Sequence, residues 1–179
     1  MKKLVVFDRD GVINHDNPNY IRSPEDWHPI DGAAEAIAKI SASNISIAIA
    51  TNQAGIAKNC FSMRTLEQIH QKMISHVRSF GGNIDRIYFC PHQPSDHCDC
   101  RKPNPKMLLQ ACSDFNVETS TTYFIGDSLR DTQAAVSAGC KPALVLTGNG
   151  KVTSMHPDLP KEIEIYSSLL DFAVMLSST

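Results

Sequence analysis

The stretch Leu4-Val5-Val6-Phe7-Asp8-Arg9-Asp10-Gly11 begins as an unbroken apolar run and ends in two carboxylates and a glycine. A continuous apolar run of this length is typical of a strand that is covered on both faces, as in a parallel sheet. Two carboxylates ahead of a glycine can hold a divalent cation and leave one oxygen free to attack phosphorus. Alone the pattern is weak, because Asp and Gly are also common in charged turns.

The rest of the chain alternates short apolar runs with helical patterns, which predicts a parallel sheet flanked by helices. We therefore expect an α/β fold, a Rossmann-like doubly wound parallel sheet, with strands at residues 4–8, 45–51, 84–90, 122–127 and 143–147. Helices are expected at residues 32–41, 63–79, 106–115, 131–138 and 167–176. Ser62 is expected to cap the second helix, and Gly139 to end the fourth.

The size and composition of the chain limit the number of its domains and the kinds of partner that it can bind. Its 179 residues suit one globular domain, so residues 1–179 are expected to form a single domain. A formal charge of −2 and scattered basic residues argue against a nucleic-acid partner. No apolar run approaches the roughly 20 residues that cross a bilayer, and Asp8 interrupts the apolar start of the chain too early for a signal peptide. We expect a cytoplasmic monomer with no membrane partner.

Polar clusters follow several of the expected strands. Thr51-Asn52-Gln53 and Gly126-Asp127-Ser128 each end a strand, and Arg101-Lys102 follows a later loop. In open α/β sheets, ligands bind beyond the carboxyl ends of the strands, so these clusters are expected to converge with Asp8 and Asp10. Hydroxyl, amide and ammonium donors beside carboxylates suit a phosphoryl group and a metal ion.

The six cysteines fall into two groups. Cys60, Cys112 and Cys140 stand alone and are expected to be small buried hydrophobes. The loop at residues 90–100 instead gathers Cys90, His92, His97, Cys98 and Cys100. Three thiols and one imidazole suit a closed, structural Zn²⁺ site, and either histidine could complete it. The other interpretation is a loop with unpaired cysteines or an oxidised pair, which a reducing cytosol disfavours.

The four polar clusters together resemble the motifs of the haloacid dehalogenase superfamily of phosphatases, over residues 4 to about 148. The resemblance implies that Asp8 is the nucleophile and becomes a phospho-aspartate, while Asp10 is the general acid and base. It also implies that Thr51 and Lys102 stabilise the transferred phosphoryl group, that Mg²⁺ is held by Asp8, the Asp10 carbonyl and Asp127, and that His92 rather than His97 joins the zinc ligands. Asp131 is left open between orienting this site and capping the helix that it precedes.

The substrate implied by the resemblance is a small phosphorylated sugar. Members of this superfamily often carry a cap domain, but the intervals between the motifs are too short for a separate one. The substrate is expected to meet Asp16, Asn19, Tyr20, Asn52, Gln53 and Arg101. Within the superfamily, the motifs resemble phosphatases that remove the 7-phosphate of D-glycero-D-manno-heptose 1,7-bisphosphate in nucleotide-activated heptose synthesis. A histidinol-phosphate phosphatase is the alternative, and a catalytically inactive zinc-stabilised binding module is a third.

Overall fold

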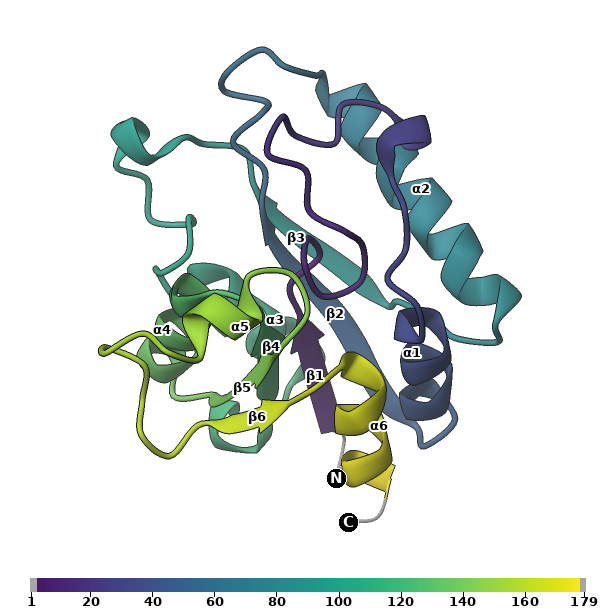
Figure 1. The fold of residues 1–179 in the computed structure, drawn as a ribbon, viewed down its shortest axis with the longest axis vertical. Coiled ribbons are helices and arrows are strands. Elements are labelled where there is room, and N and C mark those ends of the chain that lie inside the picture. Colours follow the sequence, from purple (N-terminus) through teal and green to yellow (C-terminus); the bar gives the residue numbers. More distant parts are fainter. Residues whose placement is uncertain (1–2, 178–179) are drawn as a thin grey trace.

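The computed structural model describes residues 3–177, and within that range one sheet of six parallel strands forms the centre of the molecule (Figure 1). The strands lie in the order β3-β2-β1-β4-β5-β6. Their bounds are β1 (Lys3–Phe7), β2 (Ile45–Asn52), β3 (Arg86–Cys90), β4 (Tyr123–Gly126), β5 (Lys141–Val145) and β6 (Glu164–Tyr166). The expectation of a Rossmann-like α/β fold is confirmed.

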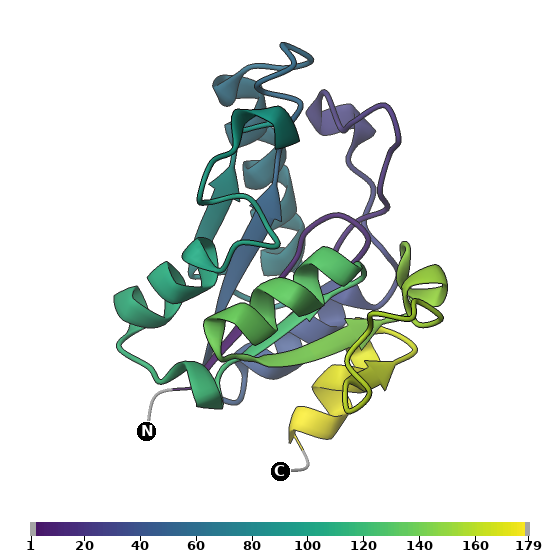
Figure 2. The same cartoon turned by 90° about the vertical axis from the view of Figure 1, so that its left-hand side faces the viewer.

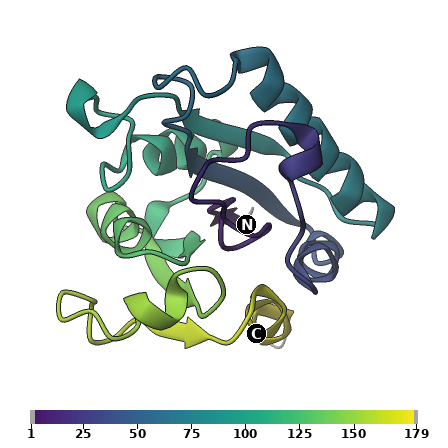
Figure 3. The ribbon, with the colours of Figure 1, turned by 45° about the horizontal axis from the view of Figure 1, so that its top comes forward.

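Helices cover both faces of the sheet (Figures 2 and 3). One face packs against α1 (Ala33–Ser41), α2 (Met63–Ser79) and α6 (Leu169–Ser177). The other packs against α3 (Lys106–Phe115) and α4 (Leu129–Ala138). The short α5 (Gly150–Thr153) follows β5. Because the four inner strands β2, β1, β4 and β5 are covered on both faces, they are apolar at most positions.

The two cores divide the strand side chains by alternation. In β1, Val5 and Phe7 belong to the core under α1, α2 and α6, whereas Leu4 and Val6 belong to the core under α3 and α4. Successive side chains of a strand point to opposite faces, so one uninterrupted run supplies both cores. β1 lies near the centre of the sheet, between β2 and β4, so its carboxyl end lies near the middle of the sheet edge that points upward in Figure 1.

Several predicted boundaries differ from the structure. β6 and α5 were not predicted. β6 is a three-residue, largely exposed edge strand that leaves no apolar run in the sequence, and α5 has only four residues. α4 begins at Leu129 rather than at residue 131, so Asp131 lies inside the helix. β5 covers residues 141–145, two residues before the predicted range, and β3 starts two residues late. The predicted caps at Ser62 and Gly139 are confirmed.

The loops that follow the strands contain no separate cap domain. The segment from β1 to α1 is a loop with one 3-10 turn at Pro24–Asp26, and the segment from β2 to β3 holds only α2. The absence of a cap, as predicted from the sequence, leaves the carboxyl edge of the sheet open. Within residues 3–177, no helix combines the length and apolarity needed to cross a membrane.

Candidate active site

A pocket of about 300 Å³ lies at the carboxyl edge of the sheet. Its walls come from segments that are far apart in the sequence: the ends of β1 and β2, the loop after β3, and the start of α4. It therefore unites most of the residues that the sequence singled out, namely Asp8, Asp10, Asp16, Tyr20, Thr51, Asn52, Gln53, Arg101, Lys102 and Asp131. Asn19 and Asp127 are not among the lining residues: the Asn19 backbone carbonyl accepts a hydrogen bond from Arg22, and the Asp127 carboxylate lies close to those of Asp8 and Asp131.

Asp8 is held by one carboxylate oxygen only. Its Oδ1 accepts a hydrogen bond from the Arg9 backbone N–H (2.8 Å) and forms an ion pair with Lys102 Nζ (2.9 Å). No such contact engages Oδ2 within the described chain, and the residue is 9% exposed. A buried carboxylate with one oxygen fixed and the other free has the geometry of an oriented nucleophile.

Three buried carboxylates crowd this point. Oxygens of Asp8, Asp127 and Asp131 lie within 4.8 Å of one another. Burial first, and then the neighbouring carboxylates against the opposing effect of Lys102, raise the pKa of Asp8 to about 8. Burial and Asp131 likewise raise the pKa of Asp127 to about 6. A single ammonium does not balance three carboxylates, so the donor set of Asp8 and Asp127 fits a hard divalent cation such as Mg²⁺.

Lys102 is positioned from three sides. Its ammonium, 2% exposed, pairs with Asp131 Oδ1 (2.6 Å) as well as with Asp8. Burial lowers the pKa of Lys102, but Asp131 and Asp8 together raise it above its ordinary value, so the side chain stays charged. The Asn52 side chain binds the Lys102 backbone twice, accepting from its N–H (3.0 Å) and donating to its carbonyl (3.1 Å). Asn52, predicted to contact substrate, thus has its amide occupied in holding Lys102.

The question left open for Asp131 is answered by two contacts. Its Oδ2 accepts a hydrogen bond from the Ser128 backbone N–H (3.0 Å), in a capping box at the start of α4. Its Oδ1 pairs with Lys102. The residue therefore does both things that the sequence allowed, and it does the capping from the third position of the helix rather than from before it.

The Asp10 carboxylate is enclosed by a hydrogen-bond network. Arg9 donates to both of its oxygens (3.0 Å each), Asn14 donates to Oδ1 (2.9 Å) and Gln53 donates to Oδ2 (3.0 Å). Burial raises the pKa of Asp10, but Arg9 and the donors Asn14 and Gln53 outweigh it and hold the pKa below its usual value. Gln53 also donates to Thr51 Oγ1 (2.9 Å), so this predicted substrate contact braces two other site residues.

Asp127 is oriented by a loop after β5 that sequence reasoning missed. The backbone N–H of Asn149 donates to Asp127 Oδ2 (2.8 Å), and Thr153 Oγ1 donates to the Asp127 carbonyl (2.8 Å). A Cβ at Gly148, which has a φ of +54°, would lie 2.2 Å from Asp127 Oδ2. Only glycine fits so close a contact. The Gly-Asn-Gly run at residues 148–150 was the available signal, but nothing in the sequence ties it to Asp127.

The mouth of the pocket is rich in cations. Lys58, Arg101 and Arg130 line it together with Asp16 and Tyr20 from the loop after β1. None of the three cations has an ion-pair partner among residues 3–177. Burial, and then the charge of Arg130, lower the pKa of Arg101. Two guanidiniums that repel each other beside a third cation form a favourable place for an anionic group.

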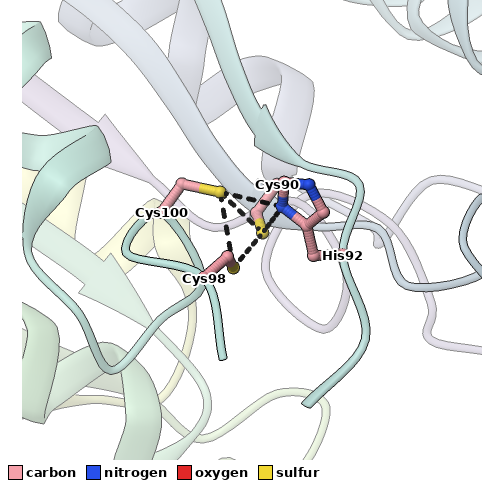
Figure 4. Close-up of side chains that lie close together, drawn as sticks. All are labelled: Cys90, His92, Cys98 and Cys100. Atoms are coloured by element: carbon pink, nitrogen blue, oxygen red, sulfur yellow. Dashed lines mark hydrogen bonds between the residues drawn. The ribbon is translucent and has the colours of Figure 1, made fainter. Parts of the chain in front are cut away.

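The predicted zinc ligands converge in the loop after β3 (Figure 4). Cys90 Sγ lies 3.5 Å from Cys98 Sγ and 3.0 Å from Cys100 Sγ, and His92 Nδ1 lies 3.3 Å from Cys100 Sγ. These separations and the two others in the cluster, all between 3.0 and 3.6 Å, lie at or somewhat below the roughly 3.5–3.8 Å between ligand atoms around a tetrahedral Zn²⁺, so the four side chains are gathered closely enough to hold such an ion. His97 lies outside the cluster and is exposed.

The cysteine loop is joined directly to the pocket. Arg101 follows Cys100, and its Nη1 donates to the His92 carbonyl (3.1 Å). Of the other cysteines, Cys112 and Cys140 are buried as predicted, but Cys60 is partly exposed, which corrects its assignment as a buried hydrophobe. Its loop position after β2 leaves it outside both cores.

Comparison with known proteins finds relatives that are phosphatases, in agreement with the chemistry of this site. The family model described as HAD-hydrolase-like matches residues 99–171. D-glycero-beta-D-manno-heptose-1,7-bisphosphate 7-phosphatase of Neisseria meningitidis serogroup A is 45% identical over 173 residues, covering 96% of this chain and 92% of the relative. The enzyme of that name from Bordetella bronchiseptica is 41% identical, covering 97% of each chain.

Solved structures agree as well. D,D-heptose 1,7-bisphosphate phosphatase from B. bronchiseptica, complexed with magnesium and phosphate, superposes with a TM-score of 0.96 at 40% identity over 98% of both chains. The corresponding enzyme from Burkholderia thailandensis gives a TM-score of 0.80 at 37% identity, over 99% of this chain and 100% of the other. Full-length similarity at this level identifies the chain as an enzyme of the HAD-like hydrolases, and it belongs to their D-glycero-beta-D-manno-heptose-1,7-bisphosphate 7-phosphatase family.

Proposed function

We propose that this protein is a magnesium-dependent phosphatase that removes the 7-phosphate of D-glycero-D-manno-heptose 1,7-bisphosphate through a phospho-aspartate on Asp8. The observation that carries the proposal is the division of the pocket into two parts. Its floor holds Asp8 and Lys102, with the Asp127 carboxylate close to Asp8, and its mouth holds three cations that form no ion pair among residues 3–177. A substrate with one phosphate to be cleaved and another to be held matches this division.

The first half of the reaction transfers the phosphoryl group to the protein. Asp8 Oδ2 attacks phosphorus in line, and the bond to the sugar oxygen breaks. The Lys102 ammonium and the Thr51 hydroxyl donate to the phosphoryl oxygens as charge moves onto them. Mg²⁺, held by Asp8, Asp127 and the carbonyl of Asp10, would reduce the repulsion between carboxylate and phosphate.

Asp10 supplies and removes the protons. It gives a proton to the departing alkoxide, and it then takes one from the water that attacks phosphorus and frees Asp8. The surrounding network of Arg9, Asn14 and Gln53 favours the carboxylate, which suits the second step. For the first step, the negative phosphate arriving beside Asp10 raises its affinity for a proton, since a like charge nearby disfavours ionisation.

The second phosphate is proposed to meet Arg130 and Arg101. Arg130→Ala should raise KM for the heptose bisphosphate about tenfold, because one charge-assisted contact is lost, while kcat changes little. KM for the heptose monophosphate that lacks the 1-phosphate should not change. Steady-state kinetics with both anomers of the bisphosphate, and with histidinol phosphate, make the measurement. Arg78→Ala, on the exposed end of α2, is the control. A wild-type preference for histidinol phosphate would contradict the proposed substrate.

The raised pKa values of Asp8 and Asp127 predict how magnesium stabilises the fold. Without metal, the folded protein keeps protons on these carboxyls up to about pH 8 and about pH 6, whereas the unfolded chain releases them near the ordinary carboxyl pKa of 3.8. The free energy of unfolding of the metal-free protein should therefore fall as pH rises across this window. Mg²⁺ competes with those protons, so its stabilising effect should grow with pH.

Thermal unfolding with and without MgCl₂, at about pH 5.5 and about pH 8.5, tests this expectation. The increase in Tm caused by magnesium should be clearly larger at the higher pH. In Asp127→Asn, which loses one ligand, the magnesium effect should shrink at both pH values. An equal shift at the two pH values in the wild-type protein would show that these carboxyls do not bind the ion.

The remaining assignments follow from the same proposal. The cluster at Cys90 is proposed to hold structural zinc, and thiolate ligands are kept in the reducing cytoplasm, where we place the enzyme. Its product would serve the synthesis of nucleotide-activated heptose for lipopolysaccharide. We also propose that residues 1–179 form a single domain that acts as a monomer.

A further inference from the structure

The inward face of α2 carries one polar side chain among apolar ones. His70 is 7% exposed, and its neighbours on this face are Leu66, Ile69, Met73 and Val77. The ring of Phe89, on β3, meets it edge-on at 6.2 Å between ring centroids. A buried polar group among apolar neighbours requires a hydrogen-bond partner, because an unpaired one destabilises the fold.

The partner of His70 is Arg9. His70 Nε2 lies 3.3 Å from Arg9 Nη1. A guanidinium only donates hydrogen bonds, so Nε2 must be the unprotonated acceptor and the ring proton must sit on Nδ1. Burial, and then the charge of Arg9, lower the pKa of His70 to about 3. The imidazole is therefore neutral, and it acts as a fixed acceptor.

Two other N–H groups of the Arg9 guanidinium donate hydrogen bonds to Asp10. Nε donates to Asp10 Oδ1 and Nη2 to Oδ2, both at 3.0 Å. The guanidinium is 1% exposed, so water does not replace a lost partner easily. Because the planar Arg9 guanidinium is hydrogen-bonded to His70 as well as to Asp10, it keeps one orientation. This orientation in turn fixes the Asp10 carboxylate.

We infer that His70 is a positioning residue for catalysis: it fixes the Arg9 guanidinium, and Arg9 aims the Asp10 carboxylate at the bond being broken. The inference rests on the proposed function, in which Asp10 transfers the protons. Without an acceptor at position 70, a buried donor of Arg9 is left unpaired and the fork is free to rotate. Proton transfer depends on such alignment, whereas binding of the phosphates at Lys102 and Arg130 does not.

His70→Leu and His70→Gln separate positioning from packing. Both fill the space, but only the Gln carbonyl can accept from Arg9. We expect His70→Leu to lower kcat about tenfold or more with KM nearly unchanged, and His70→Gln to recover most of the activity. His76→Leu, on the same helix but packed on Trp27, is the matched control and should keep wild-type kcat. The assays use the heptose bisphosphate and p-nitrophenyl phosphate.

The assay with p-nitrophenyl phosphate separates a failure of the proposed substrate from a failure of the role inferred for His70. If the wild-type protein cleaves p-nitrophenyl phosphate but not the bisphosphate, the proposed substrate is wrong, and the His70 variants are still compared on the simple ester. A His70→Leu protein with wild-type kcat, or a His70→Gln protein as slow as His70→Leu, would overturn the inference. Should His70→Leu fail to fold, ¹⁵N NMR of the wild-type imidazole decides. An unprotonated Nε2 supports the inference, and a proton on Nε2 refutes it.

Discussion

Replacing Asp8 with Asn is expected to lower kcat by more than about 10⁴-fold, because the amide nitrogen placed at the position of Oδ2 cannot attack phosphorus. The other half of the side chain would keep its place. An Asn carbonyl can still accept the hydrogen bond that the Arg9 N–H gives to Asp8 Oδ1. Steady-state assays and acid-quench trapping of a labelled phosphoenzyme would make the measurement, and only the wild-type protein should be labelled.

The stability of the same variant supplies a second readout. Asp8 has a raised pKa because burial and neighbouring carboxylates disfavour its charge. A neutral amide removes that repulsion, so Asp8→Asn without metal should melt at the wild-type temperature or higher at neutral pH. Asp114→Asn, at the end of α3 and outside the pocket, should keep wild-type activity. Activity of Asp8→Asn within tenfold of wild type would exclude Asp8 as the nucleophile.

Replacing Cys100 with Ser is expected to abolish the proposed binding of zinc and to lower Tm by roughly 10 °C or more, because a closed four-ligand site contributes its binding energy to folding. Activity with magnesium present should fall as well. Arg101 follows the cluster directly and donates to the His92 carbonyl, and Lys102 is the next residue. A loop without its metal no longer holds these two cations over the pocket.

Elemental analysis for zinc, thermal unfolding and phosphatase assays check this expectation together. Cys60→Ser is the matched control, since Cys60 is partly exposed and lies outside the cluster. It should retain wild-type metal content, Tm and activity. A Cys100→Ser protein with one zinc per chain and unchanged Tm would show that the cluster is not a structural metal site.

The sheet and the cluster of three cysteines and one histidine were predictable from the sequence for the same reason, which is that each depends on local pattern. Continuous apolar runs such as Leu4–Phe7 identify strands buried on both faces, and strand ends in a parallel sheet share one edge. The ligands of the cysteine loop lie within eleven residues, from Cys90 to Cys100, so their convergence needs only a turn. The exposed β6 left no comparable pattern and was missed.

The contacts of the polar side chains were decided by the tertiary structure. The sequence shows that Asn52 and Gln53 can donate hydrogen bonds, but not that Asn52 holds the Lys102 backbone or that Gln53 holds Asp10. The partners are 50 and 43 residues apart along the chain. Only the approach of loops from different strands determines which donor meets which acceptor.

The residues around Asp8 illustrate the same division. The stretch from Leu4 to Gly11 by itself determined a strand covered on both faces and a pair of carboxylates at its end, whereas its central place in the sheet came from the structure. It did not determine that Arg9, between those carboxylates, is buried against His70 of α2, or that Asn149 orients Asp127. Periodicity records which side of an element is buried, whereas a hydrogen bond between distant elements depends on distances that exist only once both elements have packed on the sheet.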